Sequence, residues 1–231
     1  MQYGHVIKAI FLERPNRFIA HCQVAGDIQK VHVKNTGRCK ELLVPGAVVY
    51  LEECDYPNRK TKYSLIAVEK EGLLINMDSQ APNQVVEEAL RADRIKLPDL
   101  SESIQCIRRE KTYGQSRFDF YLETESKKVF IEVKGVTLEE DGIVRFPDAP
   151  TERGVKHINE LISASQEGYM CYVLFVIQME KARYFTPHRE RHPEFANILV
   201  QAAQNGVGIL AYTCEVEPDR LTLSKAIEVK L

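Results

Sequence analysis

The sequence predicts an α/β plus β fold, with a small N-terminal β-barrel followed by a mixed-sheet α/β domain. Residues 1–80 contain short segments in which apolar and polar residues alternate between turn signals. Such segments at close spacing are typical of a small barrel. After residues 81–83 the apolar residues recur at helical spacing, and helices then alternate with apolar strands. We therefore expect two domains, spanning residues 1–80 and 81–231.

The composition is that of an ordinary globular protein. The chain has 231 residues, of which 44% are hydrophobic and 28% charged, and its net charge is −2, so a substantial core can be buried. The six cysteines show no short paired spacing, which argues against a zinc ribbon or a disulfide framework. The longest apolar run, 170–177, is too short to span a bilayer, and no signal pattern opens the chain. We expect a cytoplasmic protein with no membrane partner.

Five strands are predicted for the barrel, each with alternating polarity. They are Val6–Leu12, Phe18–Val24, Gln29–Val33, Ala47–Glu52 and Tyr63–Glu69. Two connecting segments, 33–40 and 56–63, combine cations with turn residues or tyrosines. Such residues hold anions, follow a phosphate backbone and stack on bases, although a plain turn and a solvated loop explain them equally well. The candidate nucleic-acid-binding cations are Lys34, Arg38, Lys40, Arg59, Lys60 and Lys62.

The second domain is expected to run helix, three strands, helix, strand, helix, strand. Asn83 is a favourable N-cap for the first helix. Thr151 is a plausible N-cap for the second, which ends just before Gly168. The remaining elements are a short strand, a hairpin, two apolar strands and a third helix: Gln105–Lys111, Arg117–Gly135, Cys171–Ile177, Val207–Tyr212 and Pro193–Asn205.

The hairpin carries the main functional signal. Its alternating apolar residues are Phe118, Phe120 and Leu122 on one arm and Ile131 and Val133 on the other. An antiparallel register that puts these residues on one face, such as the one that pairs Phe120 with Ile131, sets Asp119 opposite Glu132, with Lys134 further along the same face. Two carboxylates and an ammonium group are costly to desolvate together, and a divalent cation compensates them directly. The hairpin is therefore predicted to form a metal site.

Two helices offer further candidates. In the first helix, whichever of Glu87 and Glu88 is less exposed could point at the hairpin, although most helix glutamates are solvated. The polar face of the second helix is either solvated charge or a cationic edge that faces substrate. Its residues are Arg153, Lys156, His157 and Glu160.

The element order and the residues Asp119 and Glu132-Val133-Lys134 resemble the PD-(D/E)-x-K nuclease superfamily. More specifically, the sequence resembles the sugar fermentation stimulation protein A family (SfsA). The motifs that carry this likeness run through nearly the whole chain: Asn35-Thr36-Gly37, Glu88-Ala89, 116–120, 131–138, 146–149, 151–154 and Lys156-His157.

This resemblance implies an N-terminal OB-like barrel, a PD-(D/E)xK nuclease-like domain, DNA binding and regulation of sugar (maltose) metabolism. It implies Glu88, Asp119 and Glu132 as metal ligands for Mg or Mn. It also implies Asp119, Glu132 and Lys134 as the catalytic set. The family continues with Arg after the position of Asn83, where this chain has Gln84, which puts one basic contact in doubt.

Three hypotheses follow. In the first, the chain is a metal-dependent DNA nuclease in which Arg153 and Lys156 contact the leaving-side phosphate. In the second, it is a non-cleaving, largely sequence-nonspecific DNA-binding regulator that keeps the site without using it. In the third, Asp119 and Lys134 form a structural ion pair in a domain that docks a protein. Strand preference, sequence preference and assembly into a homo-oligomer stay open.

Overall fold

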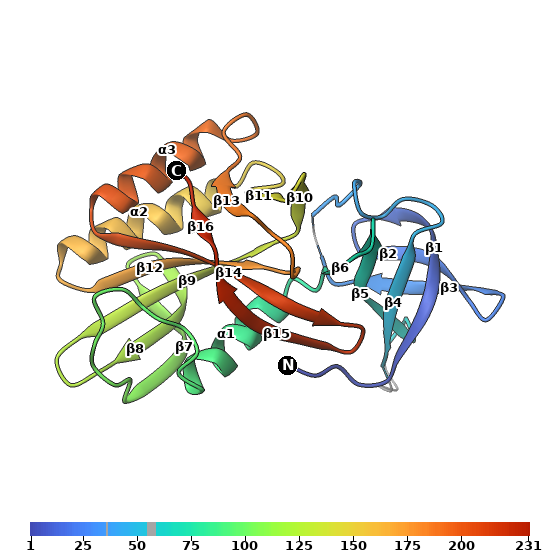
Figure 1. Cartoon of the computed structure of the whole chain (residues 1–231), viewed down its shortest axis with the longest axis horizontal. Coiled ribbons are helices and arrows are strands. Elements are labelled where there is room, and N and C mark those ends of the chain that lie inside the picture. The colour runs from blue at the N-terminus through green and yellow to red at the C-terminus, as the bar shows by residue number, and fades with distance from the viewer. Residues whose placement is uncertain (36, 55–58) are drawn as a thin grey trace.

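The barrel lies at one end of the molecule in the computed structural model, which describes residues 1–35, 37–54 and 59–231 (Figure 1). Its strands are β1 Val6–Asn16, β2 Ile19–Val24, β3 Asp27–Val33, β4 Val48–Glu53, β5 Tyr63–Lys70 and β6 Leu73–Asn76. They pair in the order β3-β2-β1-β4-β5-β6, and parallel pairing of β3 with β5 closes the barrel. All five predicted strands are confirmed, and β6 is an addition.

Period-two alternation places the barrel core as expected. In β2, for example, Ala20 and Cys22 are fully buried while His21 and Gln23 are not, because successive side chains of a strand point to opposite faces. The buried side chains of the barrel include Phe11, Leu51 and Leu65.

The second domain is built on a six-stranded mixed sheet with the order β15-β14-β12-β9-β8-β7. Its strands are β7 Cys106–Tyr113, β8 Ser116–Glu123, β9 Lys128–Val136, β12 Met170–Ile177, β14 Val207–Glu217 and β15 Arg220–Ala226. Strands β9, β12 and β14 run parallel, and the others pair antiparallel to their neighbours. The predicted mixed α/β sheet is confirmed.

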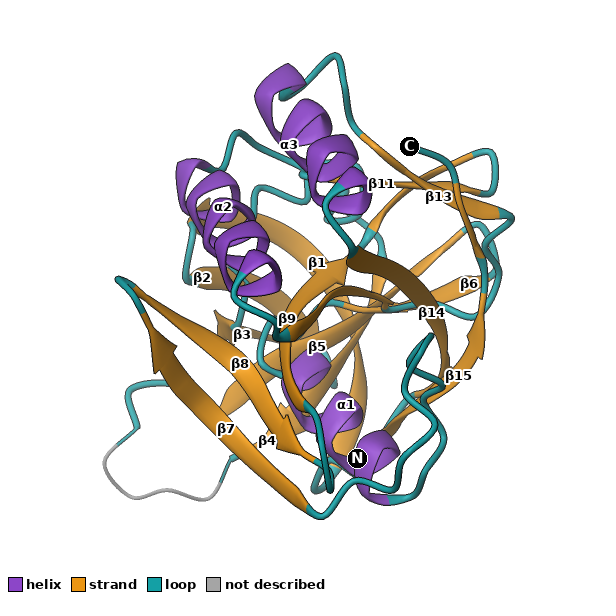
Figure 2. Cartoon of the chain, turned by 90° about the vertical axis from the view of Figure 1, so that its left-hand side faces the viewer, coloured by secondary structure: helices purple, strands orange, loops and turns teal. Residues whose placement is uncertain are grey.

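Helices cover both faces of this sheet. Helix α1 (Ala81–Arg91) packs on the face that carries Ile131 and Val133. Helices α2 (Glu152–Gln166) and α3 (Pro193–Gln204) lie side by side on the other face (Figure 2). Alternate residues of each central strand thus contact different helices, which explains why these strands read as continuous apolar runs.

A small four-stranded sheet was not predicted. It consists of β10 Leu138–Glu140, β11 Ile143–Phe146, β13 Tyr184–Pro187 and β16 Glu228–Val229, in the order β10-β11-β13-β16. Each strand has four residues or fewer, which is too short for alternation to be recognised in the sequence.

The helix starts test the two N-cap predictions. Thr151 caps α2, because its hydroxyl oxygen accepts a hydrogen bond from the backbone N–H of Gly154 at 3.0 Å. The prediction of Asn83 as the cap of α1 is wrong. Helix α1 begins earlier, at Ala81, with Pro82 in its first turn, where a residue without an N–H is tolerated. Asn83 therefore lies inside the helix with its amide free for another contact.

The barrel and the α/β domain are firmly joined. One contiguous cluster of buried apolar side chains runs from the barrel, where it includes Phe11, to Phe118 and Phe175 of the α/β domain. The buried side chain of Gln178 donates to the Asn76 side-chain oxygen at 2.9 Å and to the backbone oxygen of Asp78 at 3.0 Å. The packing across this contact fixes the two domains relative to one another.

Two global features bear on the class of protein. The six cysteines, all of which are described, are free thiols. Within the described ranges, no helix is long and apolar enough to cross a membrane.

Candidate metal centre

The register of the central hairpin is confirmed, but its arms part at Asp119. The ladder runs from Glu123↔Lys128 to Phe120↔Ile131, as predicted, and ends there. The predicted common face for Phe118 and Phe120 is wrong, since Phe118 packs in the cluster of α2 and Phe120 in that of α1. Between these two residues, the Asp119 carboxylate accepts a hydrogen bond from the backbone N–H of Val133 at 2.8 Å.

Asp119 is held from two sides. Its Oδ2 accepts the Val133 N–H, and its Oδ1 accepts the side-chain amide of Asn83, also at 2.8 Å. Each carboxylate oxygen has a second lone pair, so both can still bind a further group. The first turn of α1 thus orients a carboxylate at the point where β8 and β9 part.

Glu132 is almost completely buried, with 2% of its surface exposed. Its Oε1 accepts hydrogen bonds from Lys134 Nζ at 2.5 Å and from His157 Nδ1 at 2.6 Å. Its Oε2 is buried and has no hydrogen-bond partner among the described residues. A buried carboxylate oxygen without a donor is unfavourable, and a cation would supply the missing partner.

The pairing of His157 fixes its tautomer. Arg153 Nε donates to His157 Nε2 at 3.3 Å, and an arginine can only donate. Nε2 is therefore the unprotonated nitrogen, and the proton on Nδ1 is donated to Glu132. A neutral imidazole thus links the exposed Arg153 to the buried carboxylate, a contact that sequence reasoning missed.

His157 carried a signal that the sequence does contain. It lies three residues after Gly154 and four before Leu161, and both of these are buried on α2. That spacing places His157 on the buried stripe of the helix, so it is not part of the solvated polar face to which it was assigned.

The two carboxyl groups are driven in opposite directions. Burial raises the pKa of Asp119, and the nearby charge of Glu132 raises it further. Burial also opposes ionisation of Glu132, but the hydrogen bond from His157 and the charge of Lys134 hold the pKa of Glu132 below its usual range. Carboxyl groups whose environments separate their pKa values are typical of functional sites.

The structure does not bring Glu88 to this site. The Glu88 carboxylate pairs with the N-terminal ammonium group of Met1 at 2.6 Å and is 43% exposed. Each residue turns a helix by about 100°, so Glu88, five residues after Asn83, points well away from Asp119. No group of three or more acidic, histidine or cysteine side chains that could hold a metal ion occurs in the described part of the chain.

Glu87 is the less exposed glutamate of the pair, as the hairpin-facing candidate should be. Its carboxylate contacts Arg109 on β7 at 3.4 Å and Arg91 at 2.8 Å. The Glu87 carboxylate is thus paired with two neighbouring arginines and not with the groups at Asp119. The helix-borne acid expected beside Asp119 is replaced by an amide, that of Asn83.

The third hypothesis required an ion pair between Asp119 and Lys134. The ammonium group of Lys134 instead pairs with Glu132, and the described ion pairs do not include one between Asp119 and Lys134. That hypothesis therefore loses its physical basis.

The predicted nucleic-acid-binding cations differ in whether the structure already pairs them with other side chains. Lys34 pairs with Glu52 at 3.0 Å and Asp78 at 3.2 Å and is only 19% exposed, so its charge is already compensated within the protein, and its contact with phosphate stays a prediction. Arg59 donates to Ser64 at 2.8 Å, and Lys62 pairs with Glu53 at 2.7 Å. The segment 55–58 of the same loop lies outside the described residues.

Arg38, Lys40 and Lys60 are exposed. Arg38 and Lys40 line a hollow of about 410 Å³ together with Arg17. On α2, Lys156 is exposed and donates to the backbone oxygen of Gln115 at 3.3 Å. Two of the predicted cations, Arg38 and Lys40, thus share one hollow.

A closed five-stranded barrel fused to a helix-flanked mixed sheet, with Asp119, Glu132 and Lys134 where the central hairpin opens, defines a two-domain protein that combines an OB-type barrel with an α/β domain. The chain belongs to the sugar fermentation stimulation protein family. The family model described as "Sugar fermentation stimulation protein RE domain" matches residues 80–220, and "SfsA N-terminal OB domain" matches residues 12–77.

Relatives match over the full length. The chain is 51% identical to a sugar fermentation stimulation protein homolog of Desulfitobacterium hafniense, covering 100% of this chain and 99% of the relative. It is also 51% identical to a homolog of Clostridium beijerinckii, covering 100% of both. The structure of Pyrococcus furiosus SfsA in complex with Ca²⁺ is similar, with a TM-score of 0.89 and 28% identity over 100% of this chain and 98% of that one.

Proposed function

We propose that this protein binds DNA and hydrolyses its phosphodiester bonds with a divalent metal ion, Mg²⁺ or Mn²⁺, held by Asp119 and Glu132. The observation that carries the proposal is the buried, unpartnered Oε2 of Glu132 beside a second carboxylate whose pKa is raised. Mg²⁺ is commonly bound through one or two carboxylates, with waters and substrate phosphate as its other ligands. A site with two carboxylates fits that requirement.

The relative from Pyrococcus furiosus supports this choice of metal class. Its structure contains Ca²⁺, which takes oxygen ligands as Mg²⁺ does. When bound, such an ion polarises a phosphodiester oxygen and lowers the pKa of an attacking water.

The residues around the carboxylates have separate tasks in this proposal. Asn83 orients Asp119, and neutral His157 keeps Glu132 ionised while its Oε2 stays available. Lys134, which is 16% exposed, is the group that can position water or stabilise charge developing on the phosphate. Arg153 supports His157 from the solvent side.

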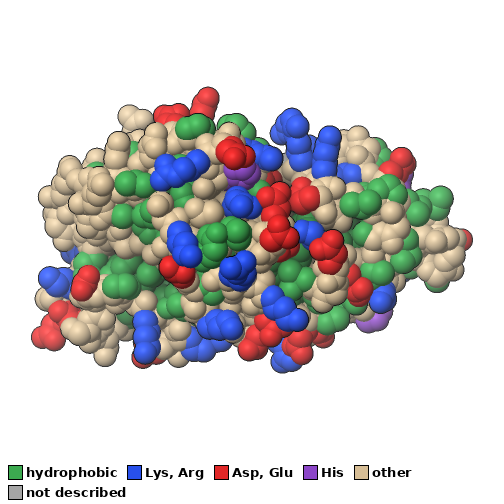
Figure 3. Space-filling view, turned by 45° about the horizontal axis from the view of Figure 1, so that its top comes forward, with side chains coloured by type: hydrophobic (Ala, Val, Ile, Leu, Met, Phe, Trp, Pro, Cys, Tyr) green, Lys and Arg blue, Asp and Glu red, His purple; other side chains and the backbone are tan. Residues whose placement is uncertain are grey.

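In this proposal a small group of cations, and not an extended basic surface, binds the DNA backbone. Lysine and arginine side chains are scattered among acidic ones over the face seen in Figure 3 and do not merge into one basic surface. This agrees with the net charge of −2. The hollow lined by Arg17, Arg38 and Lys40 is the best-defined place for backbone phosphates, since phosphate contacts come mostly from such cations.

A second candidate is a non-cleaving DNA-binding regulator of sugar (maltose) metabolism. It is favoured by the state of Lys134 and Glu132, which pair with one another, and by the position of Glu88, which leaves the centre with two acids. In both cases we propose a cytoplasmic location, since six free thiols suit a reducing compartment.

Cleavage assays separate the two candidates. Supercoiled and linear DNA would be incubated with the full chain in Mg²⁺, Mn²⁺, Ca²⁺ or EDTA, beside Asp119→Ala, Glu132→Gln and Lys134→Ala. The matched control is Lys128→Ala, which changes an exposed lysine on the same strand. Metal-dependent cutting that only the three site variants lose establishes the nuclease. If no protein cuts DNA and all variants bind DNA with the same affinity and salt dependence, the result supports the non-cleaving regulator.

A further inference from the structure

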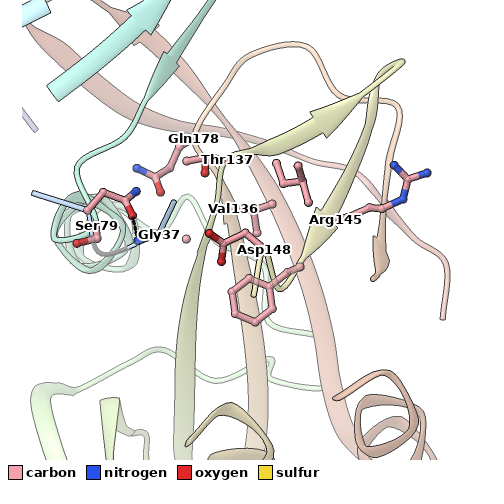
Figure 4. A pocket seen from close by; sticks show the side chains of 11 residues that line it. Gly37, Ser79, Val136, Thr137, Arg145, Asp148 and Gln178 are labelled. Carbon is pink, nitrogen blue, oxygen red and sulfur yellow. Dashed lines mark hydrogen bonds between the residues drawn. The ribbon is translucent and has the colours of Figure 1, made fainter. Parts of the chain in front are cut away.

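A cavity of about 160 Å³ lies where the barrel meets the α/β domain, apart from the two carboxylates (Figure 4). Asn35 and Gly37 line it from the barrel side, Gly135 lines it from the end of β9, and Thr137 and Gln178 line it from the residues directly after β9 and β12. The side chain of Asp148 points toward Gly37 across it (Figure 4). Its lining therefore depends on both domains.

Three sequence segments that the metal centre does not explain converge on this cavity. They are the turn at Asn35 and Gly37, the segment from Gly135 to Leu138, and the segment that contains Phe146 and Asp148. The first of these segments lies far from the other two in the chain. None of them supplies a side chain to the centre at Asp119 and Glu132.

Two glycines allow acceptor groups to approach the backbone here. A Cβ on Gly37 would lie 2.5 Å from Asp148 Oδ2, and a Cβ on Gly135 would lie 2.6 Å from Gln178 Oε1. Any larger residue would displace these oxygens. Glycine is thus needed at both positions because the Asp148 carboxylate and the Gln178 amide oxygen occupy the space that a Cβ would take.

Two of the polar side chains that line the cavity, Gln178 and Asp148, present acceptor oxygens to it. The amide nitrogen of Gln178 is used by Asn76 and Asp78, which leaves its oxygen at the cavity. The amide of Asn35 is also used, since it donates to the Met77 backbone oxygen and accepts from the Gly37 N–H. Within the described chain no donor contacts the Asp148 carboxylate.

The rim of the cavity is fixed by Arg14. Its guanidinium group donates to the backbone oxygens of Asn35, Gly37, Arg38 and Arg17 at 2.7 to 2.8 Å. These hydrogen bonds hold the backbone oxygens of Asn35, Gly37 and Arg38 in place at the rim, and a preformed lining is what a binding site requires.

The charge of the cavity selects the kind of ligand. Arg145, although part of the lining, directs its guanidinium group away from Asp148 (Figure 4) and pairs with Glu140 at 2.8 Å. An anion such as phosphate would therefore meet the Asp148 carboxylate without compensation. Apolar surface is supplied by Val136, Leu138 and Phe146. These features fit a flat, neutral group with N–H donors on one edge.

We infer that this cavity receives an unstacked nucleobase with two adjacent N–H donors, of which guanine is the natural example, with its Watson–Crick edge on Asp148. Single-stranded bases are recognised through this edge and through contact with aromatic side chains. The inference rests on the proposed function, in which the chain acts on nucleic acid.

The position of the cavity suits that role. Gly135 directly follows Lys134 of the metal centre, and Gly37 also lines the hollow of Arg17, Arg38 and Lys40. A strand whose phosphates lie at this hollow and at the metal centre passes the cavity between them. The base it holds gives the protein a sequence preference beside the phosphate that is cut.

Mononucleotide binding to the full chain in EDTA tests the inference without cleavage. Saturation-transfer NMR titrations would compare GMP with AMP, CMP, UMP and IMP, the last of which lacks the exocyclic amine of guanine. We expect GMP to bind at least about tenfold more tightly than the others, because a bidentate base contact is worth roughly that factor or more. Equal binding of all five, or none, overturns the inference.

Two variants locate the binding. Asp148→Asn preserves the size of the side chain, removes its charge and is expected to lose the preference for GMP. Gly37→Ala, which fills the space beside Asp148, is expected to do the same, with retention of the fold checked by circular dichroism. Asp27→Asn, at the exposed start of β3, is the matched control. A GMP preference that Asp148→Asn retains contradicts the assignment.

The outcome is independent of the nuclease proposal. GMP binding that depends on Asp148, in a protein that cuts no DNA, supports the base site and rejects the nuclease. Cutting without any base preference, in a protein that does not bind GMP, supports the nuclease and rejects the base site.

Discussion

His157 Nδ1 lies 2.6 Å from Glu132 Oε1, and this hydrogen bond joins helix α2 to the buried carboxylate of the central strand. The other oxygen of Glu132 is left without a partner among the described residues. In the second domain, Oε1 of Glu132 is therefore used in a structural hydrogen bond, whereas Oε2 is available to a ligand.

Replacing His157 by Leu should destabilise the protein by about 1–3 kcal/mol, because the variant removes a donor from a buried charged group. The pKa of Glu132 is below its usual value of 4.5, so ionised Glu132 contributes stability above that pH and loses it as the pH falls through the folded-state pKa. The deficit of His157→Leu should therefore shrink on acidification.

Urea unfolding at neutral pH and near pH 4 measures this difference. Lys156→Ala, an exposed neighbour on the same helix, should change the free energy of unfolding by less than about 0.5 kcal/mol. Equal effects of the two variants would show that His157 does not support Glu132.

Mg²⁺ or Mn²⁺ should raise the melting temperature, since a ligand that binds only the folded state stabilises it by about 2.7 kcal/mol at 100 times its Kd. The raised pKa of Asp119 means that protons compete with the metal at a pH above the usual value of 3.8. As the pH falls, the metal-dependent rise in melting temperature should therefore disappear at a higher pH than it would if Asp119 had the usual aspartate pKa.

Thermal scans with and without metal across this pH range give the result, with Asp119→Ala as the variant expected to show no metal effect. Asp27→Asn should respond as the unaltered protein does. The metal centre would be placed wrongly if Asp119→Ala kept the full shift.

Asn83→Asp should strengthen metal binding, because it sets a third carboxylate beside Asp119, where Asn83 Nδ2 now lies 2.8 Å away. Without metal the same variant should be less stable, since two carboxylates would repel one another. Glu88→Gln should leave metal affinity unchanged, because Glu88 pairs with Met1.

Isothermal titration with Mn²⁺ distinguishes these cases. Gln84→Ala, on the exposed side of the same helix, serves as control. A loss of affinity in Glu88→Gln of the size seen in Asp119→Ala would restore Glu88 as a ligand.

Lys34→Met should mainly reduce the stability of the fold, whereas Arg38→Ala should mainly weaken DNA binding. Lys34 holds Glu52 and the nearly buried Asp78, and removal of one partner of such a pair costs up to about 3–5 kcal/mol, less for the partly exposed Glu52. Arg38 is exposed, so Arg38→Ala should keep the fold but weaken DNA binding and reduce the salt slope by about 1.

Fluorescence anisotropy with labelled DNA over a range of salt concentrations, beside urea unfolding, separates the two effects. Lys30→Ala, an exposed lysine on β3, is the control for charge alone. An unchanged salt slope in Arg38→Ala would remove the basic hollow from the DNA interface.

The sequence by itself determined the elements that depend on local pattern. Alternation on both hairpin arms favoured registers that keep the apolar residues on one face, and β8 and β9 adopt the one suggested, from Phe120 to Glu123, because a shift by one residue would expose the apolar set. The cap at Thr151 followed in the same way from the chemistry of a single turn. The closed barrel followed from five short strands.

The tertiary structure decided which polar group meets which. Periodicity locates the apolar stripe of α1, but Asn83, Glu87 and Glu88 all lie beside that stripe, and only docking on the sheet selects Asn83 for Asp119. The pairing of Lys34 with Asp78 likewise requires the final placement of chain segments distant in sequence. Such contacts are set by packing across the molecule, which no local pattern encodes, and the cavity at Gly37 and Asp148 exists for the same reason.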